Sequence, residues 1–350
     1  MAATHWLGGP PADRERLASW ALARIASTAA EDARVDATVD IEYAARDVEA
    51  DLGGRFGADT VGEPANRRRE ERRSLRLAGI SPLRLREEDS DEPWAVLFDP
   101  ARLIRGIGAV TEASRSGEWV ELALVPDALF AAPTDPWLPP GAHGLTLRLD
   151  PVSGFLRSAT LHDEQGPLAT ARVTDLDVLD TRSSAEAGTP LARMAETLLE
   201  PARLAAKVRI EADPHDDLSF TAVPSARSWT ISSGAETLTM TGEYEPDRTS
   251  PAAARLAEML APARIVSHLA YVEATSPTSV RATVRPLRTF PFSAWAPDET
   301  LTCHFTVDPA TGVLVRAEAT AGHRTVFRHI ITALGPQGHA RPVAHGSAGP

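Results

Sequence analysis

Residues 147–157, LRLDPVSGFLR, and residues 305–316, FTVDPATGVLVR, contain the pattern that decides the fold. In both stretches apolar residues alternate with polar ones up to an Asp-Pro-x-Ser/Thr-Gly segment, after which the chain is apolar again. Alternation with a period of two is typical of a strand with one buried face. The Asp-Pro-x-Ser/Thr-Gly segment combines a proline of fixed φ, a hydroxyl that bonds nearby backbone and a glycine free to take positive φ. Both stretches therefore predict a β-hairpin.

Further alternating stretches extend each hairpin into a meander. The return strands are expected over residues 155–162 and 313–320, and the last strands over 169–178 and 325–334. The strands that precede the hairpins are expected over residues 118–125 and 279–284.

Other features recur in the same order, which predicts an internal duplication. Pro-Ala-Arg occurs at residues 100–102 and 262–264, and Trp137 and Trp295 precede the two Asp-Pro turns by the same interval. Proline is favourable in the first turn of a helix, and Asp99 is a suitable N-cap, so a short helix is expected to begin at residue 100.

Each copy is expected to open on a helix that leads into a strand. The helices are predicted over residues 17–28 and 189–198, the second capped by Thr189 ahead of Pro190, and the strands over 33–43 and 205–212.

This order predicts an α+β fold of two tandem, strongly curved antiparallel β-sheets (half-barrels), each with helices packed on the concave side. We expect one domain over residues 1–183, a second over 184–336, and a disordered tail over 337–350.

Composition excludes several classes of protein. The net charge of −12 argues against nucleic-acid binding, which favours a basic surface. The single cysteine, Cys303, excludes an internal disulfide or a multi-cysteine metal site. No apolar run approaches the ~18 residues of a membrane span. The N-terminal residues do not read as a secretory signal, so a cytoplasmic location is expected.

The repeated segments resemble LolA-like proteins, the lipoprotein carriers whose fold also occurs in the N-terminal domain of RseB-type regulators and in LppX-type lipoproteins. The aliphatic strand, the Asp-Pro-x-Ser/Thr-Gly turn and the arginine-bearing return strand carry the resemblance, at residues 147–157 and 305–316. The Pro-Ala-Arg helices resemble those of actinobacterial members. The resemblance implies an incomplete, strongly curved barrel with an apolar concave side, known for binding rather than for catalysis.

On this reading the ligand-binding side chains point into the concave side, and we expect no catalytic residue, metal or cofactor. The predicted ligand-binding residues are Trp137, Leu147, Leu149, Trp295, Phe305 and Val307. The leading hypothesis is a binder of a hydrophobic small molecule, lipid or lipidated peptide. One alternative is a structural or regulatory module with filled cavities that binds a protein partner, and another is a cavity enzyme such as a cyclase.

Other chemically active residues have simpler interpretations. Cys303 and His304 are strand neighbours that point to opposite faces, which predicts a core cysteine and no nucleophile–base pair. His162, His323 and His329 match no metal motif and are expected to be solvated or structural. The charged residues 67–73 are expected to form a solvated loop or helix face.

Overall fold

The computed structural model describes most of the chain. The described residues are 8–44, 71–82, 93–126, 142–183, 185–199, 204–212, 216–225, 228–233, 236–241, 258–284, 301–336 and 341–343. They belong to two compact units, Met1–Ala185 and Glu186–Pro350.

The first unit opens on a helix and continues with strands interrupted by two 3₁₀-helices. Its elements are α1 (Arg14–Ser27), η1 (Thr28–Ala30), β1 (Glu31–Tyr43), β2 (Glu71–Ile80), η3 (Pro93–Phe98), η4 (Pro100–Gly106), β3 (Ile107–Ser116), β4 (Trp119–Pro126), β5 (Gly144–Leu149), β6 (Leu156–Asp163) and β7 (Gly166–Ser183).

The second unit also opens on a helix and continues with strands that a short helix interrupts. Its elements are α3 (Ala185–Glu196), β8 (Leu204–Ala212), β9 (Asp216–Ser225), β10 (Ser228–Ser233), β11 (Glu236–Thr241), α5 (Ala263–Val266), β12 (Leu269–Ser276), β13 (Ser279–Val284), β14 (Leu301–Val307), β15 (Leu314–Ala321), β16 (Arg324–Pro336) and β17 (Arg341–Pro342).

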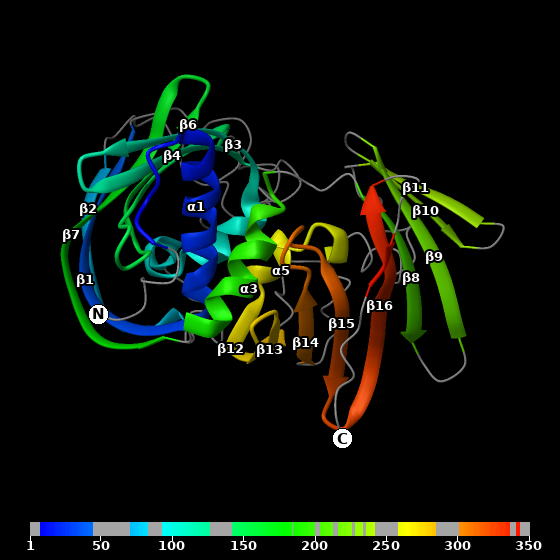
Figure 1. The fold of residues 1–350 in the computed structure, drawn as a ribbon. Coiled ribbons are helices and arrows are strands. Elements are labelled where there is room, and N and C mark those ends of the chain that lie inside the picture. The colour runs from blue at the N-terminus through cyan, green and yellow to red at the C-terminus, as the bar shows by residue number, and fades with distance from the viewer. Residues whose placement is uncertain are drawn as a thin grey trace, which may run out of the picture. The chain divides into compact units, whose positions relative to one another are not determined.

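The described strands of the first unit form a seven-stranded antiparallel sheet in the order β2-β1-β7-β6-β5-β4-β3. Figure 1 shows β1 and β7 bending around α1. The alternating pattern of β5, with Leu145, Leu147 and Leu149 buried and the residues between them less buried, explains why the sheet presents one apolar face to this helix.

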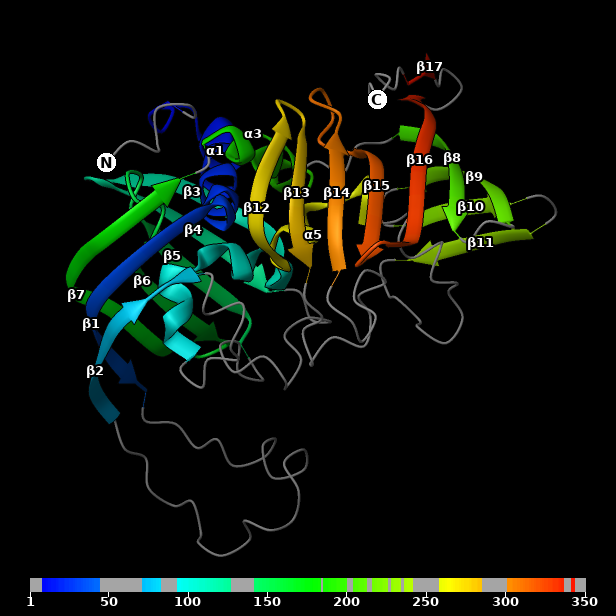
Figure 2. The same cartoon turned by 90° about the horizontal axis from the view of Figure 1, so that it is seen from below.

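The second unit repeats this order. Its sheet runs β11-β10-β9-β8-β16-β15-β14-β13-β12, with β17 paired to β16, and the run β9-β8-β16-β15-β14-β13-β12 matches β2-β1-β7-β6-β5-β4-β3 strand for strand. Figure 2 shows strands β12 to β16 side by side, with β17 near the end of β16. The predicted α+β fold of two curved antiparallel sheets is therefore confirmed.

The core of the first unit lies between the sheet and α1. Leu17, Leu22 and Ile25 of this helix are almost completely buried, and α1 packs on β3, β4 and η4. Phe98 at the end of η3 meets Phe155, just before β6, edge to face, with 5.8 Å between ring centroids. The 3₁₀-helices thus extend the layer that covers the sheet.

The short helix predicted to begin at residue 100 does begin there, as the 3₁₀-helix η4, but its predicted cap and the predicted start of the second long helix are wrong. Asp99 makes no side-chain capping bond, because Pro100 opens a tighter 3₁₀ turn in which the backbone carbonyl of Asp99 accepts the N–H of Arg102 at 3.1 Å. The second long helix begins at Ala185 and not at Thr189, since alanine and glutamate upstream favour helix and Pro190 is tolerated inside it.

The structure also differs from expectation in two other segments. Residues 71–73 are part of β2 and not of a loop or helix, and residues 341–342 of the predicted tail form β17. No described helix has the length and apolar character needed to cross a membrane.

Candidate functional site

Four of the six predicted ligand-binding residues lie in the described strands, and all four are buried. The exposed fraction is 0% for Leu147, Leu149 and Phe305 and 2% for Val307. Trp137 and Trp295 lie outside the described residues. Side chains with almost no accessible area adjoin neither bulk solvent nor a water-sized void, so these four belong to a packed core.

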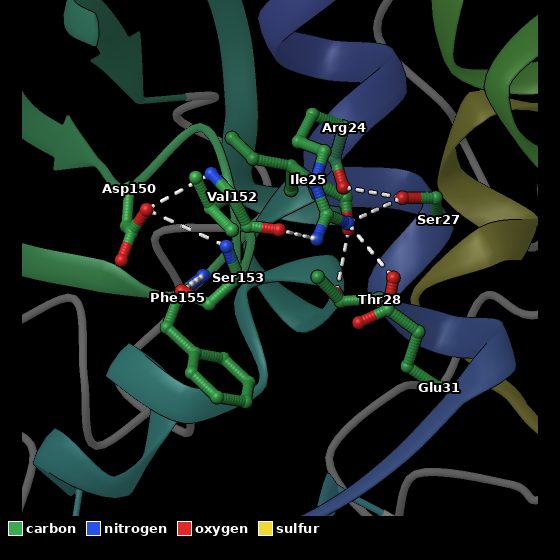
Figure 3. A network of polar contacts seen from close by, with 9 residues as sticks. All are labelled: Arg24, Ile25, Ser27, Thr28, Glu31, Asp150, Val152, Ser153 and Phe155. Carbon is green, nitrogen blue, oxygen red and sulfur yellow. Dashed lines mark hydrogen bonds and ion pairs between the residues drawn. The ribbon is translucent and has the colours of Figure 1, made fainter. Parts of the chain in front are cut away.

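A buried polar cluster joins α1 to the turn between β5 and β6 (Figure 3). Arg24, only 1% exposed, donates from Nη2 to the carbonyl of Val152 at 2.9 Å. Its Nη1 donates to Ser27 Oγ at 2.8 Å and to Glu31 Oε1 at 3.0 Å. We call this cluster, Arg24 with Ser27, Glu31 and Val152, the arginine clamp.

The turn that receives Arg24 is held by its own first residue. Asp150 Oδ1 accepts the N–H of Val152 at 2.9 Å and lies 3.4 Å from that of Ser153, while Arg157 Nη2 donates to Oδ2 at 3.0 Å. The carbonyl of Asp150 accepts the N–H of Gly154 at 2.8 Å. The turn therefore presents the carbonyl of Val152 to α1 from a fixed position.

Gly154 permits the close approach of the turn to the helix. Its φ is +76°, and a Cβ there would lie 2.6 Å from Arg24 Nη1 and 2.8 Å from Thr28 Cγ2. Both the backbone conformation and the lack of space require glycine.

The second unit repeats this contact with different chemistry. Gly312, with φ +74°, faces α3, where a Cβ would lie 2.2 Å from the carbonyl oxygen of Arg193 and 2.8 Å from Thr197 Cγ2. The side chain of Arg193, however, is 49% exposed and pairs with Glu196 at 2.7 Å. The helix–turn contact is thus common to both units, whereas the buried clamp belongs to the first.

The two helices share a sequence motif at this contact that the predicted duplication did not include. Residues 22–28 read LARIAST and residues 191–197 read LARMAET, and the same offset continues without a gap to residues 42 and 211. Arg24 and Thr28 thereby correspond to Arg193 and Thr197. The third Pro-Ala-Arg-Leu, at residues 201–204, aligns with residues 32–35.

The environment of Glu31 changes its acidity. Burial raises the pKa of Glu31, and the neighbouring Arg24 charge and hydrogen bond oppose this shift only in part. A carboxylate held here without Arg24 would be a buried, uncompensated charge.

The other candidate residues have structural roles. Cys303 is buried, as predicted, and His329 is fully buried with its ring 5.4 Å from Phe327. Burial lowers the pKa of His304, which faces Glu318 across the strand pair. Among the described residues no three His, Cys, Asp or Glu side chains gather as a metal site.

No known protein family and no curated protein matches this chain. Among solved structures, it is similar to a crystal structure of MucB, with 16% identity over 61% of this chain and 78% of that chain and a TM-score of 0.25. The Pseudomonas aeruginosa MucA/MucB complex gives 14% identity over 78% and 89%, with a TM-score of 0.23. MucB in complex with MucA(peri) gives 13% over 77% and 87%, with a TM-score of 0.20. Such low scores support no functional conclusion, so the site rests on its own geometry.

Proposed function

We propose that this protein is a non-catalytic module that binds other polypeptides, with the concave sides of its sheets filled by its own side chains. The observation that carries the proposal is the burial of Leu147, Leu149, Phe305 and Val307, whose side chains have almost no accessible area. A carrier of lipids would instead line a cavity with such residues.

The energy of displacing α1 favours this proposal over lipid binding. Uncovering Leu17, Leu22 and Ile25 would oppose ligand entry by about 1.5–3 kcal/mol for each side chain. Eight buried methylenes of a ligand would return roughly 6 kcal/mol before any cost of association. A short acyl chain therefore gains nothing by replacing the helix.

Native mass spectrometry of the purified chain, alone and with added oleate, tests the proposal. We expect the mass of the empty polypeptide in both samples. The control is Leu22→Ala, whose cavity should admit a small apolar probe such as benzene and shows that the assay detects binding. Stoichiometric retention of lipid by the wild-type chain would contradict the proposal.

A direct measurement of partner binding completes the test. Chemical cross-linking in an extract of the native host should give one discrete adduct with a second polypeptide, and excess unlabelled protein should compete for it. If excess unlabelled protein does not reduce the amount of adduct, the interaction is not specific and the proposal is contradicted.

A further inference from the structure

The last part of β7 has an edge without a strand partner among the described residues. β6 pairs with β7 only as far as Arg172, whereas β1 continues to pair with β7 to Ser183. From Val173 onward, no described strand pairs with the side of β7 that faces away from β1, and we call this side the free edge. Unsatisfied backbone groups on such an edge are a template for another strand.

The same place in the second unit is defined by register. Ala37 pairs with Leu176 in the first unit, and Ala206 pairs with Leu334 in the second. The register shifts by one residue between Val173 and Asp175 of β7, and likewise between Ile331 and Ala333 of β16. The residue that is skipped is a threonine in both strands. The free edge of β7 thus corresponds to the final part of β16.

In the second unit that edge is occupied. β17 pairs with β16 through Ala333–Pro342 and Leu334–Arg341, and the N–H of Val343 donates to the carbonyl of Thr332 at 3.1 Å (Figure 2). The chain itself therefore shows that this edge accepts an added antiparallel strand. The residues it adds come from the sequence HARPV, 339–343, which contains a basic residue.

The side chains on the free edge of β7 differ from those of β16 in charge. Asp175 and Asp177 are exposed, where β16 has Ala333 and Gly335. Val178 and Leu179 are two neighbouring large aliphatic residues whose exposed fractions are 41% and 51%. The edge is thus both acidic and apolar.

We infer that the free edge of β7, residues 173–179, binds an extended, basic segment of a partner polypeptide by strand addition. Main-chain hydrogen bonds would supply the pairing, Asp175 and Asp177 would select a basic residue, and Val178 and Leu179 would receive apolar ones. The inference names the surface and the partner class for the proposed function and rests on it.

The test uses the full chain and a synthetic peptide with the sequence of residues 337–346, QGHARPVAHG. Fluorescence anisotropy measures binding, and hydrogen exchange locates it. We expect the peptide to slow exchange over residues 173–179 and to bind less tightly as salt is raised. No binding at millimolar peptide, or protection of residues 331–336 in place of 173–179, would overturn the inference.

Matched variants separate strand addition from nonspecific attraction. In the folded chain the N–H of Val343 donates to the carbonyl of Thr332 in β16. A peptide with N-methylvaline at this position lacks that N–H, and we expect its binding to fall at least about tenfold. Asp175→Lys should weaken binding of the unmodified peptide by roughly two- to fivefold, whereas the control Glu164→Lys, in the turn that precedes β7, should not. Equal effects of these two lysine variants would contradict the assigned site.

The oligomeric state supplies a further outcome. If residues 173–179 become protected as protein concentration rises, with dimers in light scattering, the edge belongs to a second copy and the inference is wrong. Failure of this inference is distinguishable from failure of the proposed function. A chain that carries no lipid and does not bind the peptide contradicts binding at the free edge of β7. A chain that retains lipid and binds the peptide contradicts the proposal of a filled interior.

Discussion

Substitution of Arg24 should strongly destabilise the first unit. Arg24→Met keeps much of the side-chain volume but leaves the buried Glu31 without its partner, so we expect a loss of about 3–5 kcal/mol in the free energy of unfolding. The control Arg193→Met removes an exposed i,i+3 pair and should change it by less than about 0.5 kcal/mol. Urea denaturation measures both, and equal effects would contradict the clamp.

Glu31 should make stability depend on pH in a defined direction. Because its pKa is raised in the folded chain, the charged form is disfavoured there, and folding is helped as pH falls through the folded pKa toward the unfolded value of 4.5. The stability of the wild type relative to Glu31→Gln should therefore rise on acidification toward pH 4.5.

The pH prediction has an internal control with the opposite sign. A hydrogen bond from Arg328 is the main cause that lowers the pKa of Glu318, so the stability contributed by Glu318 is lost as pH falls below 4.5. Relative to Glu31→Gln, the unfolding free energy of the wild type should rise as pH falls toward 4.5. Relative to Glu318→Gln, it should fall as pH drops below 4.5. A wild type that tracks Glu31→Gln at every pH would disprove the role of Glu31.

At the scale of elements, the contact between helix and turn depends on two glycines. Gly154→Ala and Gly312→Ala each combine a positive φ, at about 1–2 kcal/mol, with overpacking, at about 1–3 kcal/mol. Gly117→Ala has a similar φ of +63° but open space around the added Cβ, so it should lose only the first part. Thermal unfolding of the three variants checks this order, and a Gly117→Ala loss as large as the others would refute the contact.

At the scale of the whole molecule, the burial of Leu147 and Phe305 predicts large effects of core truncation in both units. Leu147→Ala and Phe305→Ala should destabilise the protein by about 2–5 and 3–5 kcal/mol, because each leaves a cavity. Thr302→Ala, on the outer face of β14, should change stability by less than about 1 kcal/mol. Small losses at Leu147 and Phe305 would indicate residues that line an open cavity instead.

Much of the fold could be read from the sequence because the signals are local. The strand over residues 301–307 and the turn at residues 308–312 follow from alternation and from turn residues that act within a few positions. The missed helix motif LARxAxT was also present in the sequence, but its meaning depends on a turn that lies 128 residues away from Arg24 along the chain.

The sequence by itself determined two curved antiparallel sheets in tandem, since period-two hydrophobicity and turn chemistry operate between neighbouring residues. Only the tertiary structure decided which arginine of the shared motif is buried and that Leu147, Leu149, Phe305 and Val307 lie in a packed core. It also decided which sheet edge receives a strand. These outcomes depend on groups brought together from distant parts of the chain, because a charge is stable in the interior only where a distant partner compensates it, and an edge is open only where no distant strand covers it.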